Sequence, residues 1–230
     1  AGFASRNLDL IFAIPGQDEK RWTDDLHRAI SLKPDHLSTY CLTFEEDTAM
    51  FVKLSQGKVK IDRELEARLY RRTWETLEEN GYAQYETSNF ARTGHACRHN
   101  LITWEMGAWI GYGPSASSQW GARRWTNPAN LEQWIKGIEA SQPVLEQVKD
   151  LSPADLLCDA LVFGLRLNAG VDPHALAARF NAPLPQGVRK LFADLVEEGL
   201  MELAGTHFRL TGEGRMRADA VGVAVLEKFD

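Results

Sequence analysis

Hydrophobic and polar positions in the first part of the chain switch between strand-like and helix-like patterns. Residues 7–14 (NLDLIFAI) form a nearly continuous apolar run closed by a Pro-Gly pair, which is typical of a parallel strand covered on both faces. Apolar residues recur at helical spacing over 19–32, and Pro34 lies beyond the last turn. The β-forming stretch 36–44 follows. Strand, helix and strand in this order predict a right-handed βαβ crossover.

Helical spacing returns over residues 62–79, and the chain then changes character. Residues 82–94 predict short strand and turn, and residues 109–127 (WIGYGPSASSQWGARRWTN) are dense in glycine, serine and tryptophan. Such a composition is typical of a stretch that lines a surface or a pocket. A helix over 128–140 and the Pro-containing segment 141–150 then predict a domain boundary at the end of that segment.

The last eighty residues are expected to form a domain of their own, 151–230, after a first domain over 1–150. Three helices, a pair of short strands and a final helix are predicted in it, over 152–165, 172–180, 184–198, 200–205, 207–211 and from about residue 212. Three helices followed by a β-hairpin is the order of a winged helix.

The charge of the chain argues against nucleic acid as a partner. It carries 26 basic and 32 acidic residues, a net charge of −6, and residues 151–230 hold eight Arg or Lys and eleven Asp or Glu. A winged helix that reads DNA needs a basic face. We therefore expect this one to pack on the first domain instead.

The sequence contains no membrane or export signal. No apolar run approaches the roughly 18 residues of a membrane-spanning helix, and no basic region followed by an apolar segment opens the chain. Cys41, Cys97 and Cys158 lie too far apart to indicate a disulfide framework or a paired zinc knuckle. We expect a cytoplasmic protein with reduced thiols and no membrane insertion.

The stretch HACRHNLITW contains two histidines and a cysteine, which are candidate ligands, and three interpretations of it are open. His95, Cys97 and His99 would give zinc only three ligands, where four are usual. His99 and Asn100 could instead hydrogen-bond a turn while Trp104 anchors it in the core. The third interpretation is heme, because imidazole is a standard axial ligand of heme iron.

One residue on each of the first two strands is a further candidate. Functional groups of parallel sheets project from the carboxyl ends of the strands. Asp9 lies within the first strand, and Cys41 lies near the end of the second. The structural alternatives are a hydrogen-bonded carboxylate for Asp9 and a small core residue for Cys41.

Several sequence motifs, taken in this order, are specific enough to indicate a family: NLDLIFAIPGQ, HLSTYCLTFEEDT, YETSNFARTG, CRHNLITW and GYGPSAS. Together they resemble the oxygen-independent coproporphyrinogen III oxidase-like group of radical S-adenosylmethionine (SAM) proteins, and most closely its heme-chaperone, HemW-like branch. The resemblance covers essentially the whole chain. It implies an α/β fold: the C-terminal part of a partial (β/α)₆ TIM-like barrel, followed by an α+β winged-helix-like domain.

The resemblance also implies a [4Fe–4S] cluster and SAM in the complete protein. The family holds the cluster with a C-x₃-C-x₂-C motif and binds SAM with a glycine-rich segment, and neither motif is present here. By the resemblance, Asp9 matches a residue that contacts SAM, and the backbone near Cys41 offers a second contact. We expect this incomplete site to bind SAM weakly or not at all, and the chain alone to be inactive in radical chemistry.

The heme-chaperone branch carries H-N-x-x-Y-W where this chain has His99, Asn100 and Trp104, and Thr103 departs from its tyrosine. The resemblance implies that His99 ligates heme iron while Asn100 and Trp104 lie against the porphyrin. Cys97 is a candidate second ligand.

Three functions follow from these patterns. The first is a heme chaperone that binds heme and delivers it to acceptor apoproteins. The second is an enzyme, coproporphyrinogen III dehydrogenase of porphyrin biosynthesis, which removes two propionate carboxyls through a 5′-deoxyadenosyl radical. The third is a structural or interaction fragment without a ligand. An incomplete barrel would also leave a strand edge open, which favours pairing in a homodimer.

Overall fold

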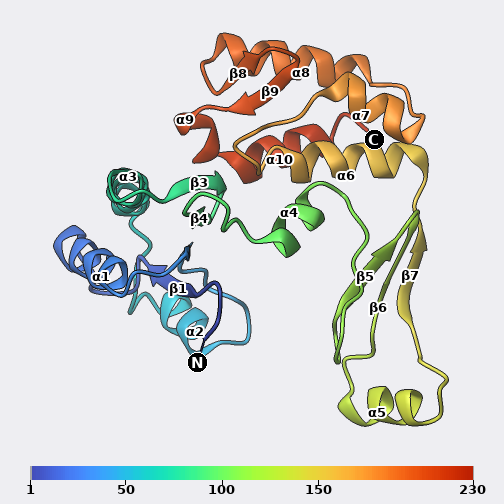
Figure 1. Cartoon of the computed structure of the whole chain (residues 1–230), viewed down its shortest axis with the longest axis horizontal. Helices are drawn as coiled ribbons and strands as arrows, with labels where there is room; N and C mark the ends of the chain where they lie inside the picture. Colours follow the sequence, from blue (N-terminus) through green and yellow to red (C-terminus); the bar gives the residue numbers. More distant parts are fainter. Residues whose placement is uncertain (1, 230) are drawn as a thin grey trace. The chain divides into compact units, whose positions relative to one another are not determined.

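The computed structural model describes residues 2–229. They fall into two compact units that divide between Cys97 and Arg98 (Figure 1). Nothing in the described part of the chain is both long enough and apolar enough, as a helix, to span a bilayer.

A four-stranded sheet with helices forms the first unit. Its elements are β1 (Asn7–Phe12), α1 (Glu19–Ser31), β2 (His36–Cys41), α2 (Ala49–Ser55), α3 (Arg63–Glu79), β3 (Ala83–Glu86) and β4 (Asn89–Ala91). The strand order is β1-β2-β4-β3, with β1 and β2 parallel and the other neighbours antiparallel. The predicted parallel βαβ unit is confirmed, whereas α2 was not predicted.

The core of this unit lies between the sheet and the helices α1 and α3. Phe12 and Leu37 from the strands pack with Trp22 and Leu26 of α1, all fully or almost fully buried. Side chains alternate between the two faces of a strand, so the even-numbered residues of β1 face this core. The odd-numbered residues, Asp9 among them, lie on the opposite face and are exposed, so the prediction that both faces of this strand are covered is wrong.

The second unit begins with a short helix and a small antiparallel sheet. These elements are α4 (Arg98–Trp104), β5 (Ser117–Trp120), β6 (Arg123–Thr126), α5 (Leu131–Glu139) and β7 (Glu146–Asp150). The sheet has the order β5-β6-β7. The helix predicted over 128–140 is confirmed, but α4 and the strands β5, β6 and β7 were not predicted.

The rest of the second unit contains the three predicted helices and the hairpin. The elements are α6 (Pro153–Gly164), α7 (Pro173–Phe180), α8 (Gln186–Glu197), β8 (Met201–Ala204), β9 (His207–Leu210), α9 (Gly212–Arg215) and α10 (Ala218–Leu226). The final helix is thus two helices rather than one. Their buried residues form a separate hydrophobic core, and Val171 adds a bridge to the hairpin at Phe208.

The division into compact units does not coincide with the expected boundary at residue 150, which stays a prediction. Residues 98–150 belong to the same unit as the C-terminal helices. One link between them is the ion pair from Arg124 of β6 to Asp159 of α6, at 2.8 Å.

Candidate functional site

The motif residues His99, Asn100 and Trp104 lie on α4. The His99 side chain is exposed, and among residues 2–229 its ring has no hydrogen-bond or ion-pair partner. Its backbone carbonyl accepts a hydrogen bond from Thr103 Oγ1 at 3.0 Å. Five residues of an α-helix turn through about 500°, so positions 99 and 104 lie about 140° apart around the axis. His99 and Trp104 therefore point from different faces of α4.

Trp104 packs against the C-terminal helices. Its ring meets Phe163 of α6 edge to face, with centroids 5.9 Å apart and an interplanar angle of 67°. The guanidinium carbon of Arg166 lies 5.1 Å from the Trp104 ring centroid, within cation–π range. Arg166 is itself paired with Asp219 at 2.9 Å. These contacts match the anchoring role that the sequence offered as an alternative for Trp104.

His95 and Cys97 precede α4 and have hydrogen-bond partners in the first unit. His95 Nδ1 lies 3.3 Å from Ser5 Oγ, and the Cys97 amide donates to Tyr85 Oη at 3.2 Å. No group of three or more His, Cys, Asp or Glu side chains within the described residues could hold a metal ion. The zinc interpretation therefore finds no ligand set there.

Asp9 and Cys41, the two candidate SAM contacts, lie on adjacent parallel strands. Asp9 pairs in register with Ser38, and Phe12 pairs with Cys41. Because side chains alternate along a strand, Asp9 and Cys41 point to opposite faces of the sheet. Cys41 packs against the core with Phe12, and Asp9 is exposed on the other side. Only the backbone near Cys41, and not its thiol, could share a ligand with Asp9.

The thiols do not fit an iron–sulfur cluster, which needs thiolates gathered at one place. Burial, assisted by the nearby Glu66 carboxylate, raises the pKa of Cys41 to about 11, despite the opposing effect of Arg63. Cys158 is buried within α6, in the second unit. A cluster in the complete protein would need ligands other than these.

A hydrogen-bonded chain that the sequence did not reveal runs from Asp9 across the sheet. Asn7 Nδ2 donates to Asp9 Oδ1 at 2.7 Å, and Asn7 Oδ1 lies 2.7 Å from His36 Nδ1. His36 Nε2 lies 2.8 Å from Tyr85 Oη, which accepts from the Cys97 amide. Since an amide oxygen only accepts, the neutral imidazole carries its proton on Nδ1, and its Nε2 accepts from the Tyr85 hydroxyl.

The surroundings of His36 favour its neutral form. Burial lowers the pKa of His36 below its ordinary value, although the negative charge of Asp9 acts in the opposite direction. No local sequence signal marks His36 as special. Its partners are 29 and 49 residues away, and only the strand register brings them together.

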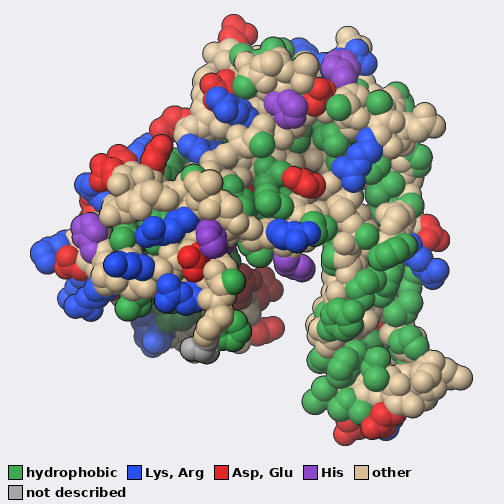
Figure 2. All heavy atoms as spheres, in the orientation of Figure 1, with side chains coloured by type: hydrophobic (Ala, Val, Ile, Leu, Met, Phe, Trp, Pro, Cys, Tyr) green, Lys and Arg blue, Asp and Glu red, His purple; other side chains and the backbone are tan. Residues whose placement is uncertain are grey.

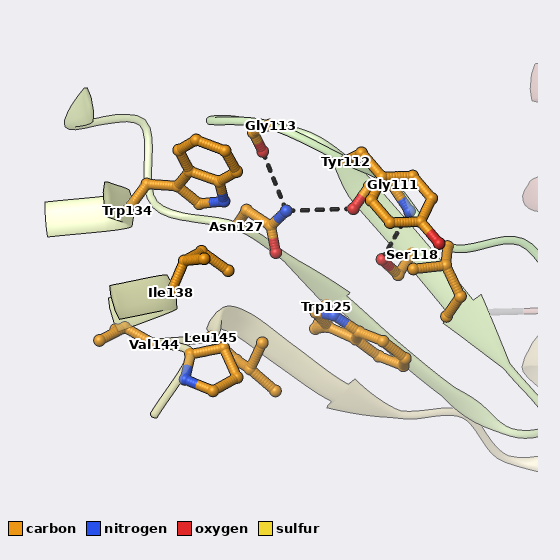
Figure 3. A pocket seen from close by; sticks show the side chains of 12 residues that line it. Gly111, Tyr112, Gly113, Ser118, Trp125, Asn127, Trp134, Ile138, Val144 and Leu145 are labelled. Carbon is orange, nitrogen blue, oxygen red and sulfur yellow. Dashed lines mark hydrogen bonds between the residues drawn. The ribbon is translucent and has the colours of Figure 1, made fainter. Parts of the chain in front are cut away.

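A pocket of about 320 Å³ lies between the small sheet and α5 (Figure 3). Tyr112, Trp125 and Trp134 supply aromatic walls, and no charged residue lines it. Asn127 Nδ2 donates to the carbonyls of Gly111 and Gly113, at 3.1 and 2.9 Å, and so ties the loop to β6. Of the surface or pocket expected along residues 109–127, the structure shows a pocket that part of this stretch lines.

The surface around this pocket is also apolar. Figure 2 shows hydrophobic side chains gathered over β5–β7 and α5. Tyr112 is 89% exposed and Trp120 is 65% exposed. Contiguous exposed apolar surface of this kind marks ligand or protein binding sites in soluble proteins.

The chain is similar over nearly its whole length to known proteins. Residues 151–217 match the HemN C-terminal domain family. The heme chaperone HemW of Bacillus subtilis (strain 168) is 29% identical over 98% of this chain and 60% of its own length. HemW of Mycobacterium tuberculosis (strain CDC 1551 / Oshkosh) is 31% identical over 96% of this chain and 55% of its own length.

A further relative agrees. The mitochondrial radical S-adenosyl methionine domain-containing protein 1 of Danio rerio is 30% identical over 97% of this chain and 51% of its own length. The chain thus spans about half the length of the curated relatives it matches.

The solved structure of coproporphyrinogen III oxidase (HemN) from Escherichia coli, a radical SAM enzyme, shares the fold. It superposes with a TM-score of 0.76 at 20% identity, over 97% of this chain and 55% of that one. The expected α/β fold, with part of a radical SAM barrel followed by a winged-helix-like region, is therefore confirmed. Taken together, the matches show a chain that carries a HemN C-terminal domain over residues 151–217 and is similar over nearly its whole length to HemW-like radical SAM proteins.

Proposed function

We propose that this chain forms the heme-binding part of a heme chaperone, with His99 as an axial ligand of the heme iron. The observation that carries the proposal is the exposed His99 imidazole, which has no partner among residues 2–229. An exposed imidazole can approach a metalloporphyrin without first breaking a hydrogen bond. The two bacterial relatives named above are themselves heme chaperones.

Neighbouring residues support the same proposal. Asn100 is half-buried beside His99 on α4 and would border the ligand. Trp104 would support the helix from its other face rather than cover the porphyrin. Cys97 is proposed as a second ligand, on the same chain segment.

The complete protein would do more than bind heme. We propose that it delivers heme to acceptor apoproteins, and that it also holds SAM and a [4Fe–4S] cluster, which supply radical chemistry when bound. Asp9 and the backbone near Cys41 would contribute to the SAM site. The free edge of β1, which pairs only with β2 among the described strands, is proposed to pair with another strand or with a second copy.

Titration of hemin into the purified chain tests the heme proposal. We expect a shifted Soret band at micromolar hemin and at least a tenfold loss of affinity in His99→Ala. His174→Ala is the matched control, because His174 is also an exposed histidine on a helix of the second unit. Equal affinity in the unmodified chain and His99→Ala would refute the assignment of His99.

The oxidase alternative has no observation of its own in its favour. The likeness to the Escherichia coli enzyme, at 20% identity, establishes the fold only. Conversion of coproporphyrinogen by a complete protein containing this sequence would support the enzyme over the chaperone.

A further inference from the structure

The helix that carries His99 is too short to be stable by itself. α4 has seven residues and no buried residue. Isolated helices shorter than about 12 residues are marginal in water. The order of α4, and with it the place of His99, must therefore come from contacts with other elements.

The C-terminal end of α4 is closed by a tight turn. Met106 is in the left-handed region with φ of 57°, and its amide donates to the Thr103 carbonyl at 3.1 Å. The Gly107 amide donates to the Ile102 carbonyl at 2.7 Å. These two bonds form a Schellman motif. Glycine is required at 107, because a Cβ there would lie 2.6 Å from the Ile102 side chain.

An arginine from another helix binds the carbonyls of this turn. Arg179 of α7 donates from Nη1 to the Glu105 carbonyl at 2.8 Å and from Nη2 to the Met106 carbonyl at 2.9 Å. The planar guanidinium fork suits two successive carbonyls, and its positive charge is favourable at a helix C-terminus. Arg179 thus caps α4 from 73 residues away.

Trp104 adds the second attachment, through Phe163 and Arg166. All three partners, Phe163, Arg166 and Arg179, lie within the segment that matches the HemN C-terminal domain. α4 is therefore held at its last turn by that domain, while His99, in its first turn, is left free.

We propose that Arg179 is a positioning residue for His99: it holds α4 so that the imidazole is presented to the ligand on a rigid helix. The C-terminal domain would then have a defined task, to support the heme ligand rather than to bind heme itself. This inference rests on the proposed function.

Arg179→Gln tests the proposal, and because Arg179 is exposed the variant should fold. We expect amide hydrogen exchange over residues 99–106 to become about tenfold faster, as the loss of one or two hydrogen bonds predicts. Hemin affinity should fall about threefold or more, and the Soret band should broaden as the axial imidazole loses its fixed orientation. Arg179→Lys keeps the charge but not the fork, and should recover only part of each effect.

Arg189→Gln is the matched control. Arg189 is an exposed arginine of the same region that also donates to a backbone carbonyl, that of Leu184 at 2.9 Å, but it does not touch α4. It should leave both the exchange of α4 and the hemin affinity unchanged. Unchanged exchange over α4 in Arg179→Gln would overturn the inference, as would an equal loss of hemin affinity in both variants.

The two proposals fail in different ways. An unmodified chain that does not bind hemin overturns the proposed function. The exchange measurement needs no heme, so it would still decide whether Arg179 holds α4.

Discussion

The guanidinium of Arg166 lies over the ring of Trp104, 5.1 Å from its centroid. This contact joins the last residue of α4 to the segment after α6, 62 positions further along the chain. The two ends of the HNLITW motif therefore have different roles. The histidine end is exposed, and the tryptophan end is an anchor.

Replacing the anchor should therefore cost stability. Removal of a half-buried aromatic ring that packs against Phe163 and Arg166 is expected to cost about 2 kcal/mol in Trp104→Ala, below the 3–5 kcal/mol of a fully buried tryptophan. Urea denaturation measures the loss. Trp120→Ala removes a ring that is 65% exposed and should change the free energy of unfolding by less than about 0.5 kcal/mol. Equal losses in the two variants would contradict the anchoring role.

The neutral His36 should make stability depend on pH. The pKa of His36 in the folded protein is lowered by burial, so the unfolded chain binds the proton more tightly. The stability that this group contributes is fully present above about pH 6.5 and is lost as the pH falls towards the folded pKa. Glutamine does not titrate, so the stability difference between the unmodified chain and His36→Gln should shrink from pH 7.5 to pH 5.5. A difference that stays constant over this range in urea denaturation would refute the assignment.

Cys41 should be chemically inert in the folded protein. With a pKa of about 11, only about one Cys41 thiol in a hundred is ionised at pH 9, and the thiolate is the reactive form. Iodoacetamide labelling followed by mass spectrometry should leave Cys41 unmodified at pH 8. In urea the same thiol should react at the ordinary rate, which serves as the control. Fast labelling of the folded chain would show that the thiol is accessible and ionised.

Gly111 should be intolerant of a side chain. A Cβ there would lie 2.4 Å from the Ser117 carbonyl oxygen, where backbone must move to make room. Gly111→Ala is expected to cost about 1–3 kcal/mol, as overpacking does elsewhere. Gly187→Ala is the comparison, because its nearest neighbours are atoms of the flexible Lys228 side chain and it lies in α8. That variant should be neutral or slightly stabilising.

The incomplete SAM site predicts weak binding. Asp9 is exposed and accepts a hydrogen bond from Asn7. The Cys41 thiol faces the core on the other side of the sheet. Two contacts do not offset the freedom that a ligand loses on binding. Isothermal calorimetry should detect no saturation at micromolar SAM, and saturation there would show that this chain alone holds a complete site.

The sequence by itself determined the longer elements and the resemblance to HemW-like proteins. The helices α1, α3 and α8 and the paired strands β1 and β2 each bury one face or both, and that leaves a local periodicity that can be read from neighbouring residues. The motifs that carry the resemblance are also short runs of neighbouring residues. They indicated the HemW-like family before any packing was known.

The tertiary structure alone decided what the motif residues do. α4 is too short to show a periodic pattern, and it is ordered by Arg166 and Arg179, which are distant in sequence. Asp9 and Cys41 were candidates for one site because they lie on neighbouring strands, yet the strand register sends their side chains to opposite faces. The physical reason is the same in each case. Periodicity reports which face of an element is buried, whereas partners come from contacts between elements that no local pattern encodes.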